Sequence, residues 1–208
     1  MNTGNQTADV ATETPLHLER TTLEGKNKIL GVWLFIGAET VLFACLFGTY
    51  LTLRNQTMGG PTGQELFSLP LIALATFILL TSSLTSVLGV VSMHQNDLRG
   101  LQLWFGITLL LGASFLGLEI YEFIHYTSLG HRFTQSAFAS SFYTLTGTHG
   151  AHVLFGLCWI LGLLIQSRKR GITKETAPRF YVASLYWHFI DVIWVFIFTV
   201  VYLMGAAG

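Results

Sequence analysis

The sequence predicts an all-α integral membrane protein, a bundle of five transmembrane helices. The chain of 208 residues is 51% hydrophobic and only 11% charged, and its mean hydropathy is +0.56. Such a composition lies outside the range of ordinary soluble domains. Five apolar runs are each long enough to cross a hydrocarbon core of roughly 30 Å, which takes about 20 helical residues. The connections between them are too short to hold a separate extramembrane domain.

The five expected spans are 29–53, 69–93, 101–123, 138–165 and 180–204. The first follows a polar segment, and the second follows a connection rich in glycine and proline, which is typical of a turn. The second span has no charged residue but carries hydroxyls that can bond back to the helix or across to a neighbour, among them Thr76, Thr81, Ser82, Ser83, Thr85 and Ser86. The third and fourth spans are rich in glycine, which allows close helix packing in lipid. The fifth follows the most basic connection.

The expected domain organisation is a polar cytoplasmic tail at 1–28 and a single five-helix transmembrane domain at 29–208. Most basic residues fall in the tail and in the second and fourth connections, Arg20, Lys26, Lys28, Arg99, Arg168, Lys169, Arg170, Lys174 and Arg179. The opposite side has Arg54 and Arg132. Because basic residues collect on the cytoplasmic side, this predicts a cytoplasmic N-terminus and a C-terminus outside. The formal net charge of zero argues against nucleic acid as a partner.

Seven ionisable side chains lie inside the expected spans: Glu39, Glu119, Glu122, His149, His152, His188 and Asp191. Ionisable groups are costly in hydrocarbon and normally face a bundle interior, a lipid headgroup or a proton path. These seven are therefore the candidate residues for buried proton or lipid contacts.

The depths of two of these residues predict an interhelical pair. Glu39 lies about ten residues into the first span, which at about 1.5 Å per residue places it close to the membrane midplane. His152 lies about 14 residues into the fourth span, which runs in the opposite direction, so the two depths nearly agree. The alternative is a neutral Glu39 that bonds to a backbone carbonyl or a hydroxyl.

Three pairs of ionisable residues, each three positions apart on one helical face, raise the question of a metal centre. The pairs are Glu119 and Glu122, His149 and His152, and His188 and Asp191. Carboxylates and imidazoles on several helices build di-iron centres in some bundles. Here the depths differ, because the two glutamates fall in the outer leaflet and the other pairs from the midplane inward. We therefore expect no metal, haem or other cofactor and no catalytic residue in this chain.

The same depths predict the partners of the other candidates. Glu119 and Glu122 are expected to contact His125, Arg132 or lipid headgroups near the outer surface. His188 and Asp191 are expected to be structural, tying the fifth span to its neighbours, with a lipid phosphate or a cationic side chain as a partner near the inner side.

Four local sequences make the prediction more specific. They are WLFIGAE at 33–39, GLEIYEF at 117–123, GTHGAHV at 147–153 and YWHFIDVIW at 186–194. In this order they resemble the signatures of subunit III of haem-copper terminal oxidases. The resemblance runs from about Glu24 to Gly205 and leaves only the tail outside. The chain is most similar to the short, five-span bacterial form, closest to the caa-type cytochrome c oxidases of Bacillus-like bacteria, with quinol-oxidase subunit III a near relative.

The resemblance implies a non-catalytic subunit of a proton-pumping cytochrome c oxidase, in the bacterial plasma membrane and the aerobic respiratory chain. It implies oxidase subunits I and II and a small subunit IV as partners, with haem and copper in those partners. It also implies phospholipid bound between the helices, and support of proton uptake and turnover stability. Glu39 matches the family's carbodiimide-reactive carboxylate. The pair of N-terminal helices of the seven-span form is missing, so part of the lipid cleft must be completed differently.

Two other functions are compatible with the buried ionisable residues. One is subunit III of a quinol oxidase. The other is a small proton-coupled transporter, because buried Glu and His residues form proton relays. Transporters commonly show inverted repeats and broken helices at the midplane, and the sequence has no sign of either, which favours the oxidase subunit.

Overall fold

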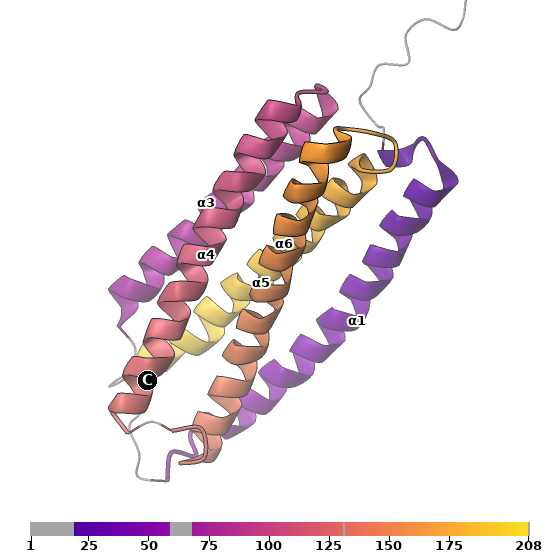
Figure 1. Cartoon of the computed structure of the whole chain (residues 1–208). Helices are drawn as coiled ribbons and strands as arrows, with labels where there is room; N and C mark the ends of the chain where they lie inside the picture. The colour runs from indigo at the N-terminus through magenta and orange to yellow at the C-terminus, as the bar shows by residue number, and fades with distance from the viewer. Residues whose placement is uncertain (1–18, 59–67, 131, 208) are drawn as a thin grey trace, which may run out of the picture.

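A computed structural model shows a bundle of five long helices whose sequence neighbours run antiparallel (Figure 1). It describes residues 19–58, 68–130 and 132–207, so the expected tail lies largely outside the described residues. The helices are α1 (Leu23–Leu53), α3 (Leu69–His94), α4 (Leu98–Ser128), α5 (Ala137–Arg170) and α6 (Ala177–Ile197). A π-helical turn, η2 (Phe198–Leu203), and a short α7 (Met204–Ala207) continue α6. The predicted all-α bundle of five spans is confirmed.

The helices extend beyond the predicted apolar spans. In particular, α1 begins at Leu23, so residues 23–28 of the expected polar tail are helical. The boundary at 28/29 between the tail and the transmembrane domain stays a prediction. The Thr22 hydroxyl accepts a hydrogen bond from the backbone N–H of Gly25 at 3.0 Å, which caps the helix. Glu24 and Lys28 then form an ion pair of 2.6 Å one turn apart. Hydropathy marks where a helix enters hydrocarbon, and these polar residues continue the helix outside it.

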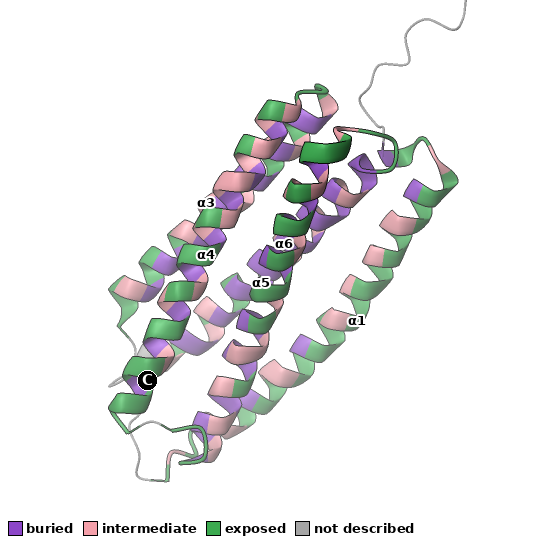
Figure 2. Ribbon diagram, viewed as in Figure 1, coloured by how far each residue is buried: buried purple, intermediate pink, exposed green. Residues whose placement is uncertain are grey.

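The core lies among α3, α4, α5 and α6, and α1 packs onto its edge through α5 and α6. Figure 2 shows this difference, because buried residues follow the inner faces of α5 and α6 whereas most of α1 is exposed or intermediate. Only 6% of the most apolar stretch of α1 is buried within the chain, against 50% for the last span. In a membrane the remaining faces of α1 must contact lipid or another protein.

Polar side chains join α3 to α6. The indole N–H groups of Trp194 and Trp187 donate to hydroxyls of Thr76 and Ser82, each at 3.0 Å. One turn further along, the hydroxyls of Ser86 and Ser184 are 2.8 Å apart. The hydroxyl-rich second span was predicted to bond to itself or to neighbours, and these contacts confirm it. Because the membrane interior holds no water, these hydrogen bonds satisfy hydroxyl and indole N–H groups that would be costly to bury without a partner.

Two glycines make room for Trp187, one of the largest buried side chains among the described residues. A Cβ at Gly112 of α4 would lie 2.7 Å from the ring of Trp187, and one at Gly156 of α5 would lie 3.0 Å from it. By contrast, a Cβ at Gly106 or Gly117 of α4 would meet no atom within 4 Å. The glycines of α4 therefore serve different faces, one packed against α6 and the other open at the bundle surface.

The helix ends gather into two sets. The start of α1, the α3–α4 connection and the α5–α6 connection lie at one end of the bundle, and the α4–α5 connection lies at the other with the end of the last span (Figure 1). The first end carries the basic residues of the second and fourth connections and those at the start of α1, whereas Arg54 and Arg132 lie at the other end. Which end faces the cytoplasm stays a prediction.

Candidate functional site

The predicted pair between the first and fourth spans is confirmed. Glu39 Oε2 on α1 lies 3.1 Å from His152 Nε2 on α5. The two side chains are 15% and 19% exposed, so the pair is largely removed from the bundle surface. It is a polar link between the peripheral helix α1 and the core.

Neighbouring groups fix the orientation of the imidazole. His152 Nδ1 lies 2.7 Å from the backbone carbonyl oxygen of Thr148, one turn earlier on α5. The Phe43 ring packs edge-on against the imidazole with centroids 5.3 Å apart. From α6, the Tyr186 hydroxyl donates to the His152 carbonyl oxygen at 3.2 Å. Thr148 and Tyr186 are not among the residues predicted from the sequence; the position of Thr148 four residues before His152 was the available signal.

An apolar pocket lies beside the pair. Its volume is about 310 Å³, and it is lined by Phe35 of α1, Ala151, His152 and Phe155 of α5, and Tyr186 of α6. Aromatic rings therefore form most of its wall, and the polar groups among the lining side chains are the His152 imidazole and the Tyr186 hydroxyl. Such a surface suits a hydrocarbon chain whose path passes a polar group.

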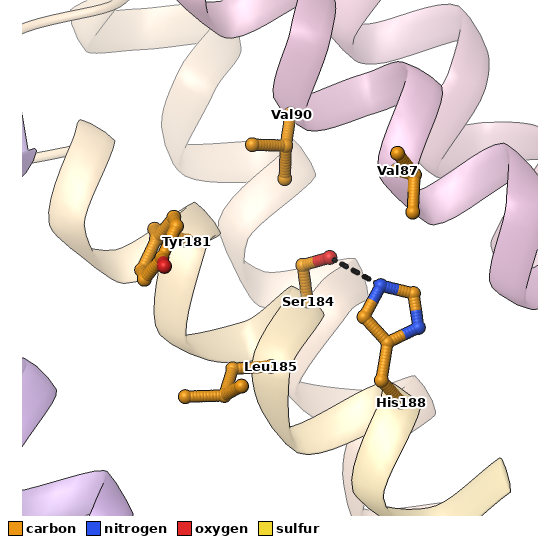
Figure 3. A pocket seen from close by; sticks show the side chains of 6 residues that line it. All are labelled: Val87, Val90, Tyr181, Ser184, Leu185 and His188. Carbon is orange, nitrogen blue, oxygen red and sulfur yellow. Dashed lines mark hydrogen bonds between the residues drawn. The ribbon is translucent and has the colours of Figure 1, made fainter. Parts of the chain in front are cut away.

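His188 connects α6 to α3. Its Nδ1 is 2.7 Å from the Ser83 hydroxyl of α3, and its Nε2 is 3.4 Å from the Ser184 hydroxyl of its own helix. Figure 3 shows His188 and Ser184 together on the wall of a pocket of about 140 Å³, with Val87 and Val90 of α3 opposite. The predicted tie between the fifth span and its neighbours is confirmed for His188.

Asp191 is placed differently. It is 3% exposed, and neither carboxylate oxygen has a hydrogen-bond partner among the described residues. The cationic side chain expected near His188 and Asp191 is not among their contacts in the described part of the chain, and the lipid phosphate stays a prediction. The tie between α3 and α6 therefore depends on His188 and the hydroxyls.

The expected surroundings of Glu119 and Glu122 are wrong. Both side chains are buried in the bundle, 4% and 6% exposed. Glu122 Oε1 accepts a hydrogen bond of 2.8 Å from the Tyr126 hydroxyl, and the Glu119 carboxylate faces Gly150 of α5 so closely that a Cβ there would lie 2.8 Å from Oε2. The physical reason is that a count of residues along a helix gives only the depth of a side chain, whereas the packing of α4 in the bundle decides that these two carboxylates face its interior.

His149 lies in the core. It is 0% exposed, and its Nε2 is 3.3 Å from the Ile190 carbonyl oxygen of α6. The rings of Phe115 and Trp194 lie 6.0 Å and 5.2 Å from it. Although His149 is one turn from His152, it faces α4 and α6, whereas His152 faces α1.

The candidate residues therefore belong to separate contacts and not to one centre. Within residues 19–58, 68–130 and 132–207, no group of three or more His, Cys, Asp or Glu side chains is placed to hold a metal ion. The expectation that the chain binds no haem or metal stays a prediction, which elemental analysis of the purified chain tests.

The comparisons with known proteins agree with one another. The family described as cytochrome c oxidase subunit III matches residues 3–206, so the match also includes most of the tail that the resemblance had left outside. The chain is 67% identical over 187 residues to cytochrome c oxidase subunit 3 of Bacillus sp. PS3, which covers 90% of each chain. It is 63% identical over 195 residues to cytochrome c oxidase subunit 3 of Bacillus subtilis, covering 93% of this chain and 94% of that one.

The chain also resembles proteins named quinol oxidase subunit 3. The chain is 52% identical over 184 residues to quinol oxidase subunit 3 of Bacillus subtilis, which covers 88% of this chain and 90% of the relative. The five-span bundle and these matches over nearly the whole length lead to one conclusion: the chain belongs to the cytochrome c oxidase subunit III family.

Proposed function

We propose that this chain is the third subunit of a proton-pumping haem-copper cytochrome c oxidase in an aerobic respiratory chain. Its family is that of a non-catalytic, accessory subunit in the bacterial plasma membrane. The observation that carries the proposal is the 67% identity to a cytochrome c oxidase subunit 3, against 52% to a quinol oxidase subunit 3. The same family assignment favours an oxidase subunit over a proton-coupled transporter.

The second candidate is subunit III of a quinol oxidase. It is favoured by the relatives with that name, which also match most of the chain. Because an accessory subunit does not itself receive electrons, the two candidates differ in the partner subunits and not in the chemistry of this chain. The identity of the co-purifying subunit II therefore separates them.

The proposed partners are oxidase subunits I and II and a small subunit IV, with the haem and copper held by those partners. The low burial of α1 and the large exposed apolar side chains over the bundle support a chain that is covered by lipid and other subunits. Orientation belongs to the same proposal, with the basic end and residues 1–28 in the cytoplasm.

The proposed ligand is phospholipid, with an acyl chain in the pocket lined by Phe35, Phe155 and Tyr186. The Glu39–His152 pair beside it joins α1 to α5 and so holds one wall of that pocket in place. In this role the chain supports proton uptake and turnover stability of the oxidase by holding lipid and structure close to the catalytic subunit, and it takes no part in electron transfer.

The test is affinity purification of the tagged chain from its native membrane. We expect a haem-bearing subunit to co-purify, together with a subunit II that has a copper-binding cysteine loop. A subunit II without that loop would favour the quinol oxidase. A parallel purification of an unrelated tagged five-span protein is the control, and a chain that purifies without any haem protein would contradict both candidates.

A further inference from the structure

The hydrogen bonds of His152 restrict where its protons lie. Nδ1 is 2.7 Å from the Thr148 carbonyl oxygen, which can only accept. An unprotonated Nδ1 would face that oxygen with a lone pair, so Nδ1 carries a hydrogen and donates it. The neutral imidazole therefore has its lone pair on Nε2, the atom that faces Glu39.

The contact between His152 Nε2 and Glu39 Oε2, 3.1 Å long, then needs one proton between the two atoms. With the proton on Oε2, a carboxylic acid donates to a neutral imidazole. With the proton on Nε2, an imidazolium donates to a carboxylate. Both arrangements make the same hydrogen bond, and both have a net charge of zero.

The other proton counts are disfavoured. With no proton, two acceptors face each other and the pair is left with a negative charge. With two protons the pair is positive. An uncompensated charge is costly in a membrane interior, and the only ion pair recorded for either group in the described residues is with the other. Of the titratable neighbours, His149 is bonded to the Ile190 carbonyl and the Tyr186 hydroxyl to the His152 carbonyl, so neither provides a counter-charge.

We propose that Glu39 and His152 form a site that binds a single shared proton, with the Thr148 carbonyl as the group that positions the imidazole. Transfer within the site breaks the Oε2–H bond and forms an Nε2–H bond, so that an acid and an imidazole become a carboxylate and an imidazolium. No other bond changes, and no oxidant or reductant takes part. The inference concerns the same pair as the proposed function, extends it from a structural link to a site of defined proton content, and does not depend on the electron donor.

The packing keeps the two atoms in place for this exchange. The edge-on contact of Phe43 limits rotation of the imidazole, and the bond from Tyr186 holds the backbone of α5 at His152. The adjacent pocket of about 310 Å³ reaches His152 itself. A change in what occupies the pocket can therefore alter the surroundings of the proton without breaking the fold.

The test is nitrogen NMR of the full-length chain with ¹⁵N-labelled histidine in phospholipid nanodiscs, combined with infrared spectra of its carboxyl groups. His152→Asn and Glu39→Gln assign the His152 and Glu39 signals by difference. We expect a protonated Nδ1 at His152 in the wild type and in Glu39→Gln, because the Thr148 carbonyl is present in both. Glu24→Gln is the matched control on α1, since Glu24 pairs with Lys28, and it should leave the His152 signals unchanged.

Besides the hydrogen on Nδ1, the wild-type pair should show one proton between Nε2 and Oε2, either as a neutral imidazole with a protonated Glu39 or as an imidazolium with a carboxylate. An unprotonated Nδ1 would overturn the proposal. So would a neutral imidazole beside a carboxylate, or an imidazolium beside a protonated acid. If His152→Asn does not fold, Glu39→Gln alone supplies the assignment, because it shifts the Nε2 signal and removes the Glu39 carboxyl band. The readout needs no oxidase partner, so its failure is separate from a failure to co-purify with a haem subunit.

Discussion

The indole ring of Trp187 on α6 packs directly against Gly112 on α4, where a Cβ would lie 2.7 Å from the ring. Trp187 is 1% exposed, and its N–H donates to Ser82 of α3. With its contact to Gly156 of α5, this one side chain touches three neighbouring helices at the centre of the bundle. The contact depends on the absence of a side chain at Gly112.

Gly112→Ala should lower the stability of the bundle, because the added methyl forces Trp187 or α4 to move. Overpacking of this kind costs about 1–3 kcal/mol. The measurement is the thermal unfolding midpoint in detergent. Gly117→Ala on the same helix is the control, since its Cβ meets nothing within 4 Å. Equal losses in the two variants would show that helix propensity or folding yield, and not the Trp187 contact, sets the effect.

Gly150→Ala should also destabilise the chain, through Glu119. The new Cβ would lie 2.8 Å from Oε2 of a buried carboxylate that has no hydrogen-bond partner among the described residues. In a Glu119→Ala background the same change should cost less, because the obstructing group is gone. The difference is a coupling of about 0.5–3 kcal/mol, as is usual for residues in contact. Additive effects in the double variant would contradict the placement of Glu119 against α5.

Ser83→Ala should loosen α6 from α3 by removing the 2.7 Å bond to His188. Hydrogen bonds between membrane helices average about 0.6 kcal/mol and reach about 1.7 kcal/mol, so we expect a loss in that range. Thr81→Val is the matched control, because the Thr81 hydroxyl bonds back to Phe77 of its own helix. Unfolding in mixed detergent measures the free energy of unfolding of both variants. A larger loss of stability for Thr81→Val than for Ser83→Ala would count against the interhelical role of Ser83.

A hydrophobic carbodiimide should label Glu39, because it reacts with a protonated carboxyl group within reach of the membrane interior. Glu39→Gln should abolish that labelling and leave oxygen reduction by the complex mostly intact. His152→Asn should speed the reaction, since an imidazole that shares the proton keeps Glu39 a carboxylate for part of the time. Mass spectrometry of labelled peptides gives both rates. Slower labelling in His152→Asn would argue against proton sharing.

Much of this fold could be predicted because each span is an apolar run of sufficient length. The pairing of Glu39 with His152 could be predicted because counts along two antiparallel spans gave the two residues nearly the same depth, and a contact between them is observed. The burial of Glu119 could not be predicted in this way, because a count along the span gives a depth but does not show which face of α4 packs against α5.

Contacts that depend on the packing of particular helices could not be predicted either. The small residues at Gly112 and Gly156 indicate close packing of α4 and α5, but only the arrangement of the helices shows that both face Trp187. The partner of Glu122 could have been predicted, because Tyr126 lies four residues later on the same helix and residues at this spacing are neighbours. The π-helical turn at Phe198–Leu203 has no signal in the sequence that we recognise.

The central claim is that this chain is an accessory subunit that supports an oxidase without carrying out its redox chemistry. The most direct measurement compares the purified oxidase with and without this chain, following haem content, initial oxygen consumption and the decay of activity during turnover. We predict an unchanged haem spectrum and initial rate, with faster loss of activity in the complex that lacks the chain. Loss of haem or copper in proportion to the missing chain would contradict the account.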